Sequence, residues 1–278
     1  MPDRYIKTIA ITSGKGGVGK TNLVAGLAIA MRRLGRKVLV FDADLGLSNI
    51  DVLLHLAPRY NIQHLLSGEK GLDEIIIDGP LGIKILPASS GIQELTSLDE
   101  FQRLKIIESF ETYDGEMDVL LIDTAAGLSE NVAFFCTSSE EIVVITSPEP
   151  TAITDAYALI KVLFTRYQEK DFKIVVNAVK DQEEGLEVFR RLSLASERFL
   201  HISLSYLGSI PYDEAVRKAV MAQRSFVDLY PNSPASRSII EMAERLIEVD
   251  GRVKGGLQFF LRNILRTSSN EEIGSIHR

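Results

Sequence analysis

The chain has 278 residues, of which 45% are hydrophobic and 25% are charged. This balance is typical of a soluble globular protein with enough apolar material for a sizeable core. The formal net charge of −7 argues against general binding to nucleic acids. The single cysteine, Cys136, excludes an internal disulfide framework and a paired-cysteine metal site, and we expect it to be buried in a helix. No apolar run approaches the roughly 18 residues that a membrane-spanning helix needs.

Short apolar runs alternate with helical stretches along most of the chain. We predict strands at residues 6–12, 37–42, 83–88, 118–123, 141–147, 172–178 and 205–211. Helical periodicity is clear at residues 21–35, 151–167 and 236–249. Strands that are apolar on both faces and alternate with helices favour an α/β fold, in which helices flank both faces of a mainly parallel, twisted sheet. Ligands of such folds bind at the carboxyl ends of the strands.

Residues 1–250 show no shift in composition and no long linker, so we predict a single domain over this range. Residues 251–278 form a second piece, which consists of a glycine hinge, an amphipathic helix and a polar tail. The first predicted strand begins almost at the start of the chain, which leaves no room for a signal peptide, and we therefore expect a cytoplasmic protein.

Residues 14–21, GKGGVGKT, match the phosphate-loop pattern G-x-x-x-x-G-K-[ST] between a predicted strand and a predicted helix. Glycines let backbone N–H groups turn inward around phosphates, next to the positive end of the helix dipole. Lys20 is predicted to neutralise phosphate charge, and the Thr21 hydroxyl to take one Mg²⁺ position. A glycine-rich turn with an incidental lysine is the alternative, but the strand–loop–helix context disfavours it. The predicted nucleotide-binding residues are Gly14, Lys15, Gly16, Gly17, Val18, Gly19, Lys20, Thr21 and Asn22.

Three aspartates follow predicted strands that lead to the same edge of the sheet. Asp42 and Asp44 lie at the end of the second strand, and Asp123 lies at the end of the strand at 118–123. A single aspartate in such a place is commonly a turn residue. Because all three fall beside a phosphate loop, we predict that Asp44 orients the attacking water, that Asp42 supports Mg²⁺ and that Asp123 belongs to the Mg²⁺ shell.

The loop contains a second lysine, Lys15, directly after its first glycine. With the stretches DADLGLSNIDVLL (42–54) and DTAAGL (123–128), the sequence KGGVGKT resembles the deviant Walker A loop and switch regions of the MinD/ParA ATPases, over about residues 5–250. The resemblance implies a P-loop NTPase fold, Mg²⁺-dependent hydrolysis of ATP to ADP and phosphate, and a nucleotide-sandwich homodimer in the ATP state. In that family the early lysine reaches the partner's phosphates, which makes Lys15, Lys20 and Asp44 the predicted catalytic residues. A solvated loop lysine is the alternative for Lys15.

The resemblance extends to the recognition of the adenine base. Asn177 ends a predicted strand and corresponds to the base-reading asparagine of the family. The stretch GSIPYDEAVRKA (208–219) resembles the family's IP-x-D loop. The resemblance therefore implies contacts to the base from Ile210, Pro211 and Tyr212.

Within the family, SPEPTAITDAYALIKVL (147–163) resembles the flagellar FlhG/FleN (YlxH-like) branch, which regulates flagellar number and placement. This branch implies the GTPase FlhF and flagellar switch (C-ring) components as partners. Glu149 and Asp155 lie where family members face the other subunit or a partner protein, although Asp155 can also simply favour a helix dipole. FlhG proteins often carry an N-terminal activator segment for FlhF, and because this chain starts at its first strand we do not expect that mode of activation.

The C-terminal piece has an amphipathic pattern with a positive charge. On a helical wheel the apolar side carries the residues predicted to enter the membrane, Leu257, Phe260, Leu261, Ile264 and Leu265. Residues 251–278 have five basic side chains against two acidic ones, and each basic residue contributes about 1 kcal/mol near anionic lipid. We expect ATP-dependent, peripheral binding to the inner face of the cell membrane. The alternative is a terminal helix that docks on the domain itself.

Three other functions are weighed against this nucleotide switch. A MinD-like septum-site ATPase is the nearest alternative, but the membrane helix of MinD usually ends the chain, whereas twelve residues follow Arg266 here. A ParA-like DNA-partitioning ATPase requires a basic surface that the acidic composition disfavours. An iron–sulfur relative requires paired cysteines, which Cys136 alone cannot supply.

Overall fold

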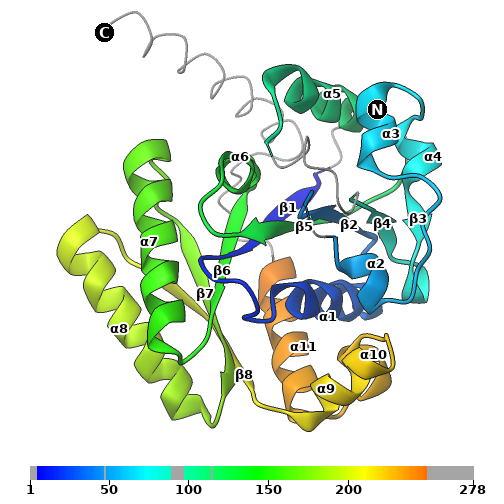
Figure 1. The fold of residues 1–278 in the computed structure, drawn as a ribbon. Helices are drawn as coiled ribbons and strands as arrows, with labels where there is room; N and C mark the ends of the chain where they lie inside the picture. Colours follow the sequence, from blue (N-terminus) through cyan, green and yellow to red (C-terminus); the bar gives the residue numbers. More distant parts are fainter. Residues whose placement is uncertain (1–4, 47, 89–96, 114, 249–278) are drawn as a thin grey trace, which may run out of the picture.

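The computed structural model describes residues 5–46, 48–88, 97–113 and 115–248 (Figure 1). Within these ranges the chain forms one eight-stranded sheet in the order β3-β4-β2-β5-β1-β6-β7-β8. Every neighbouring pair is parallel except β3 and β4. The strands are β1 (Lys7–Ser13), β2 (Val38–Ala43), β3 (Ile77–Asp78), β4 (Lys84–Leu86), β5 (Val119–Ala126), β6 (Glu141–Thr146), β7 (Phe172–Val179) and β8 (Ser205–Pro211).

Helices cover both faces of this sheet (Figure 1). The described helices are α1 (Lys20–Arg33), α2 (Ile50–Leu53), α3 (Ile62–Ser67), α4 (Leu72–Ile75), η1 (Pro80–Gly82), α5 (Glu100–Glu111), α6 (Glu130–Ser138), α7 (Pro150–Tyr167), α8 (Gln182–Leu200), α9 (Glu214–Met221), α10 (Phe226–Leu229) and α11 (Pro234–Ile247). The predicted α/β fold with a mainly parallel, doubly covered sheet is therefore confirmed. Within the described residues no helix combines the length and apolar character that a bilayer crossing requires.

All seven predicted strands are present, and the bounds of β8 agree with the prediction. β5 extends three residues further than expected, because this central strand stays paired with β1 as far as Ser13 and Ala126. β3 was not predicted: it has two residues and pairs antiparallel with β4. A strand this short has no alternation by which a sequence could reveal it.

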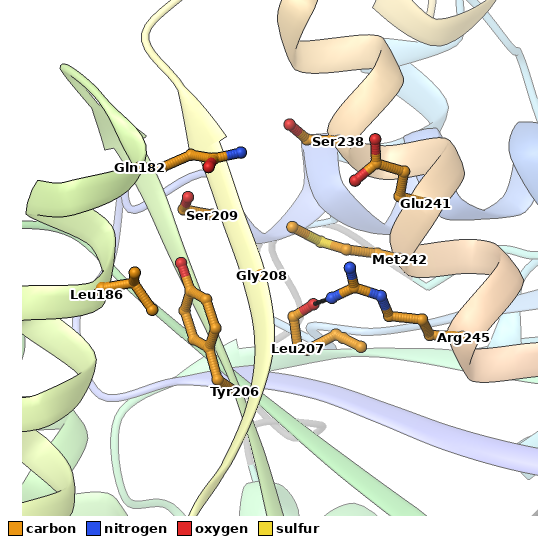
Figure 2. Close-up of a pocket in the computed structure, with 10 residues that line it drawn as sticks. All are labelled: Gln182, Leu186, Tyr206, Leu207, Gly208, Ser209, Ser238, Glu241, Met242 and Arg245. Atoms are coloured by element: carbon orange, nitrogen blue, oxygen red, sulfur yellow. Dashed lines mark hydrogen bonds between the residues drawn. The ribbon is translucent and has the colours of Figure 1, made fainter.

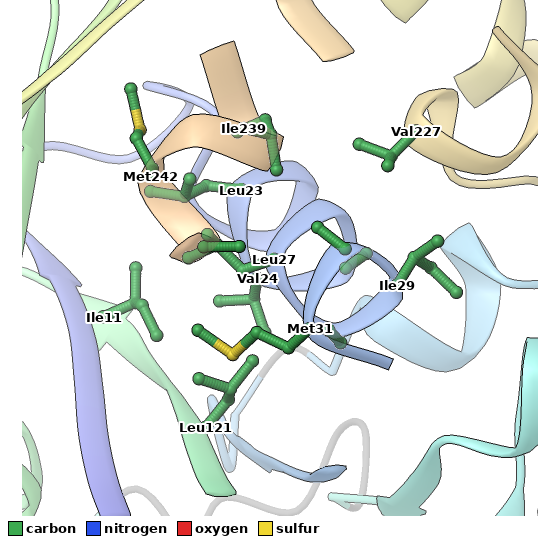
Figure 3. Close-up of a cluster of buried hydrophobic side chains, with 14 of the residues drawn as sticks. Ile11, Leu23, Val24, Leu27, Ile29, Met31, Leu121, Val227, Ile239 and Met242 are labelled. Atoms are coloured by element: carbon green, nitrogen blue, oxygen red, sulfur yellow. The ribbon is translucent and has the colours of Figure 1, made fainter. Parts of the chain in front are cut away.

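One face of the sheet packs on α1 and α11. Side chains alternate along β1, so Ile9 and Ile11 belong to this core whereas Ala10 belongs to the core on the other face. Figure 3 shows the apolar side chains of α1 between Ile11 and Leu121 of the sheet on one side and Met242 of α11 on the other. α1 is thus held on two sides, and its first residue, Lys20, has a fixed position.

The opposite face carries two further apolar clusters. One packs β2 and β5 against α3, α5 and α6, with the ring of Phe41 5.3 Å from that of Phe135 in an edge-on arrangement. The other packs β6 and β7 against α6, α7 and α8. Cys136 lies in α6 and is fully buried, as predicted, and burial raises the pKa of its thiol to about 12. We therefore assign this cysteine to packing.

The register of the sheet brings the predicted acidic residues together. Asp42 of β2 lies directly opposite Asp123 of β5, and Asp123 also pairs in register with Ile11 of β1. Asp42 and Asp123 therefore belong to strands and not to the loops that follow them. The chain leaves β1 two residues later and enters the glycine loop. Parallel pairing alone thus collects both aspartates beside the phosphate loop.

Candidate nucleotide site

The glycine loop joins β1 to α1 and opens into a cleft of about 580 Å³, a size typical of ligand sites. Gly17 and Gly19 have φ values of 79° and 96°, which side chains rarely adopt. No side chain caps the N-terminus of α1, so its first N–H groups and the helix dipole are available to an anion. The cleft is lined by Ser13, Gly16, Gly17, Gly19, Lys20, Thr21, Asn22, Asp44, Asn49, Ala125 and Ala126.

Two glycines of the loop are required by contacts within the protein. A Cβ atom on Gly14 would lie 2.2 Å from the backbone carbonyl carbon of Asp155 in α7. A Cβ atom on Gly19 would lie 2.3 Å from Nδ2 of Asn177 at the end of β7. Both distances are far below any allowed contact. These glycines therefore let the loop approach α7 and β7, whereas Gly16 and Gly17 have free space around them.

Lys20 and Asp123 form a buried ion pair beneath the cleft. The Lys20 Nζ lies 3.1 Å from Asp123 Oδ1, and the two side chains are 9% and 2% exposed. Burial raises the pKa of the Asp123 carboxyl group, and the ammonium group of Lys20 opposes that increase. The side chain of Thr21 also acts to lower the pKa of Asp123. The predicted phosphate lysine and the predicted Mg²⁺ aspartate are thus in direct contact.

Asp42 is fixed by the segment that follows β2. Its Oδ2 accepts hydrogen bonds from the Ser48 hydroxyl at 2.8 Å and from the N–H groups of Asn49 and Ile50, both at 3.3 Å. Its Oδ1 accepts one from the N–H of Asp44 at 3.1 Å. Burial and, second, the nearby charge of Asp123 raise the pKa of Asp42. Asp42 thus orients the backbone that presents Asp44 to the cleft.

The donor set fits a magnesium ion. Asp42, Asp123 and Thr21 supply carboxylate and hydroxyl oxygens, the ligands that Mg²⁺ prefers. Two carboxyl groups with raised pKa values are buried here, and of these the ammonium group of Lys20 pairs with that of Asp123 alone, so a divalent cation would compensate the remaining charge. Among the described residues there is no group of three or more His, Cys, Asp or Glu side chains that could form an all-protein metal cage. Phosphate oxygens and water would have to complete the coordination, as is usual for Mg²⁺.

Lys15 points away from this cleft within its own subunit. Its Nζ lies 2.5 Å from Glu149 Oε2 and 3.0 Å from the Thr151 hydroxyl, at the start of α7. The Lys15 side chain is 37% exposed and that of Glu149 is 65% exposed. The resemblance implies that Glu149 faces another molecule, and no local pattern in the sequence predicts this internal contact with Lys15.

Of the residues predicted to bind the base, Asn177 lies beside the glycine loop. Asn177 donates a hydrogen bond from Nδ2 to the Val18 carbonyl at 2.8 Å, which leaves its Oδ1 as an acceptor for a ligand. Ile210 is buried in the core, so only its backbone is available. Tyr212 is exposed and lines a second cleft of about 520 Å³, together with Pro148, Glu149 and Lys180.

Sequence reasoning missed two functional neighbours of Asp42. Ser48 is buried and holds Asp42, and Asn49 lines the cleft. Both lie six or seven residues after Asp42, within the stretch 42–54 that carries the family resemblance. Their place in that stretch is the signal from which the sequence could have predicted a role for them. The predicted membrane residues at 257–265 lie outside the described residues, as does the whole piece at 251–278.

The sheet order, the glycine loop and the buried lysine–aspartate pair define a P-loop nucleotide-binding protein. Residues 9–226 match the family model "CobQ/CobB/MinD/ParA nucleotide binding domain". The chain belongs to this MinD/ParA family, as the sequence predicted.

Individual proteins that are similar to this chain indicate a branch of the family. The chain is 40% identical to the antiactivator FleN of Pseudomonas aeruginosa over 94% of both chains. It is 35% identical to the flagellum site-determining protein YlxH of Helicobacter pylori, over 94% of this chain and 90% of that protein. Among solved structures, the septum site-determining protein MinD from Pyrococcus horikoshii, complexed with Mg-ADP, has a TM-score of 0.73 and 26% identity, over 88% of this chain and 98% of that one. The predicted likeness to the flagellar branch is confirmed.

The contact between Gly19 and Asn177 can be tested by substitution. We expect Gly19→Ala to weaken binding of a fluorescent ATP analogue by at least about tenfold, because the new methyl group displaces either Asn177 or the loop. Gly35→Ala is the matched control, since Gly35 also has a positive φ, 84°, but open space at its Cβ. Both variants pay a similar backbone strain of about 1–2 kcal/mol, which urea denaturation measures. Equal analogue affinity in the two variants would contradict the assignment.

Proposed function

We propose that this protein is a Mg²⁺-dependent ATPase that works as a nucleotide-controlled switch and regulates flagellar number and placement. The proposal rests on the observation that the two lysines of the loop have different partners and different positions relative to the cleft. Lys20 lies under the cleft on Asp123, whereas the ammonium group of Lys15 is held outside it on Glu149. One lysine thus serves its own nucleotide and the other is available to a second subunit.

The residues of the cleft fit phosphoryl transfer to water. The loop N–H groups and Lys20 bind the β- and γ-phosphates, and Thr21, Asp42 and Asp123 hold Mg²⁺, which neutralises charge on those phosphates when bound. Asp44 orients the attacking water, since its backbone is held by Asp42 at the mouth of the cleft. Asn177, with Pro211 and Tyr212, recognises adenine.

The homodimer is proposed to form across the face that carries the cleft. Exposed apolar side chains follow the carboxyl ends of three strands: Val52 after β2, Leu128 after β5 and Tyr212 after β8. A second copy would cover these side chains and place its own Lys15 on the γ-phosphate. The exposed Lys15–Glu149 pair costs little to break, because such pairs contribute only about 0–1 kcal/mol.

The flagellar role is supported by the FleN and YlxH likeness, which covers nearly the whole chain. Proposed partners are the GTPase FlhF and components of the flagellar switch (C-ring). A MinD-like role in septum placement is the alternative, supported by the likeness to the Pyrococcus structure. A flagellar count and a cell-length distribution in a deletion strain separate the two, since only the septum role predicts minicells.

The proposed switch acts at the membrane. Residues 257–265 have an apolar side and a basic flank, and one such helix binds lipid weakly. Two helices on one dimer gain from effective concentration. ATP-driven dimerisation would therefore move the protein from the cytoplasm to the inner face of the membrane, and hydrolysis would release it.

Size-exclusion chromatography with light scattering tests whether nucleotide drives dimerisation. With ATP and Mg²⁺ we expect Asp44→Ala to remain dimeric, because it binds ATP without positioning water, and Lys20→Ala to remain monomeric. Wild type should return to monomer as ATP is consumed. If Lys20→Ala, checked for folding by circular dichroism, dimerises as well as Asp44→Ala, nucleotide does not join the subunits.

Mixing inactive variants tests whether Lys15 acts on the partner's nucleotide. We expect Lys15→Ala and Asp44→Ala each to lose most ATPase activity while still binding ATP. In a mixed dimer the site of the Lys15→Ala subunit keeps its own Asp44 and receives Lys15 from the Asp44→Ala partner, so this site is complete. The other site of the same dimer lacks both residues. An equal mixture should therefore recover about a quarter of the wild-type activity per subunit. No recovery, with mixed dimers verified by tagged pull-down, would mean that Lys15 acts within its own subunit.

Liposome flotation tests the membrane step. We expect the protein to bind vesicles with anionic lipid in the presence of a non-hydrolysable ATP analogue and much less with ADP. Leu261→Glu should abolish this binding, because it places a charge on the apolar side of the helix. Asn263→Glu adds the same charge on the polar side and should reduce binding only slightly. Equal binding with both nucleotides would count against the switch.

A further inference from the structure

The free edge of β8 lies in an open groove between two helices. Among the described strands β8 pairs only with β7, so its other edge presents backbone hydrogen-bonding groups. A groove of about 240 Å³ runs beside this edge, with α8 on one side and α11 on the other (Figure 2). Tyr206, Gly208 and Ser209 are only half-buried, so the helices flank the strand without covering it.

Glycines set the close approach of both helices. A Cβ atom on Gly185 of α8 would lie 2.7 Å from the Ser209 Cβ, and one on Gly208 would lie 2.8 Å from the Met242 Cε of α11. Both helices therefore pack tightly against β8 at the base of the groove, and the groove runs along this strand. Leu186, Leu207 and Met242 make this space partly apolar.

Four polar side chains in the groove have no hydrogen-bond partner among the described residues. They are the amide of Gln182, the hydroxyl groups of Tyr206 and Ser209, and the carboxylate of Glu241. Figure 2 shows that they come from both walls and from the strand itself. None of these groups contributes to the nucleotide cleft. Polar groups that converge on one groove and remain available are typical of a recognition site.

The charges favour a basic occupant. Arg245 donates a hydrogen bond from Nη1 to the Leu207 carbonyl at 2.8 Å, so its positive charge is directed to the strand. Glu241 lies one helical turn earlier in α11, and among the described residues its carboxylate forms no ion pair, with Arg245 or with any other cation. Because Arg245 is bound to the strand and not to Glu241, the carboxylate of Glu241 remains available to a lysine or arginine of a ligand.

We propose that this edge groove binds an extended, basic peptide segment of a partner protein, which adds as a strand to β8. Backbone groups of the peptide pair with the β8 edge, alternate side chains enter the apolar part, and a basic side chain pairs with Glu241. The Arg245–Leu207 contact occupies one acceptor of this edge, so the peptide pairs with the backbone groups on either side of it. This site goes beyond the proposed ATPase and does not depend on it.

Fluorescence anisotropy on the full chain tests the proposal. The probe is a labelled hexapeptide of alternating valine and lysine, for which we expect a Kd of about 10⁻⁴ M, since ordering a short flexible peptide offsets much of the gain. The same peptide with glutamate in place of lysine should not bind. A version of the lysine peptide that is N-methylated at alternate residues should also fail, because it cannot pair with a strand edge.

Matched charge reversals on α11 locate the site. Glu241→Lys should weaken binding by about tenfold or more, whereas Glu244→Lys, an equal change outside the groove, should alter it less than about twofold. An equal loss in both variants would indicate general electrostatic attraction and would overturn the proposal. Unchanged binding of the N-methylated peptide, or no binding of the lysine peptide at millimolar concentration, would overturn it as well. Circular dichroism verifies that both variants are folded.

Discussion

The buried pair of Lys20 and Asp123 is the interaction on which the site depends. Removing either partner would leave a charge unpaired in the interior, at a cost of about 3–5 kcal/mol. The pair is possible only because α1 begins at Lys20 and because β5 lies between β1 and β2, which places Asp123 beneath the loop. The same ammonium group is the one that a phosphate requires. Stability and nucleotide binding thus depend on the same cation, and in the proposed switch this shared dependence is what couples the nucleotide to the state of the protein.

The two lysines of the loop have opposite environments. Lys20 is buried and paired at the base of the cleft, so it cannot leave without a replacement charge. Lys15 is exposed and held by Glu149 and Thr151, whose contacts water can replace at small cost. In the proposed dimer Lys15 is the group that reaches another molecule, and a weak resting contact suits that role. The two cations of the loop thus differ in burial and in partner, as two separate roles would require.

Apolar runs and the phosphate-loop pattern were sufficient to predict the sheet, the position of the loop and the convergence of Asp42, Asp44 and Asp123. These are local signals, because strand periodicity and a short motif are read within a few residues. The contacts of Gly14 with α7 and of Lys15 with Glu149 join residues more than 130 positions apart. No local pattern encodes such pairs. The partners of Asn177 and the groove beside β8 likewise follow from tertiary packing alone.

The sheet has two edges, and the described chain protects them differently. β3 ends one side with only two residues, and the Lys84–Asp78 ion pair lies across it. A strand so short offers little to a partner. β8 ends the other side with seven residues and a hydrogen bond from Arg245 to Leu207. The long edge also leads, at Pro211 and Tyr212, into the loop proposed to bind adenine. A protein that only had to prevent aggregation could have shortened or covered β8 as it does β3. The retained length of this edge therefore favours use of the groove for recognition.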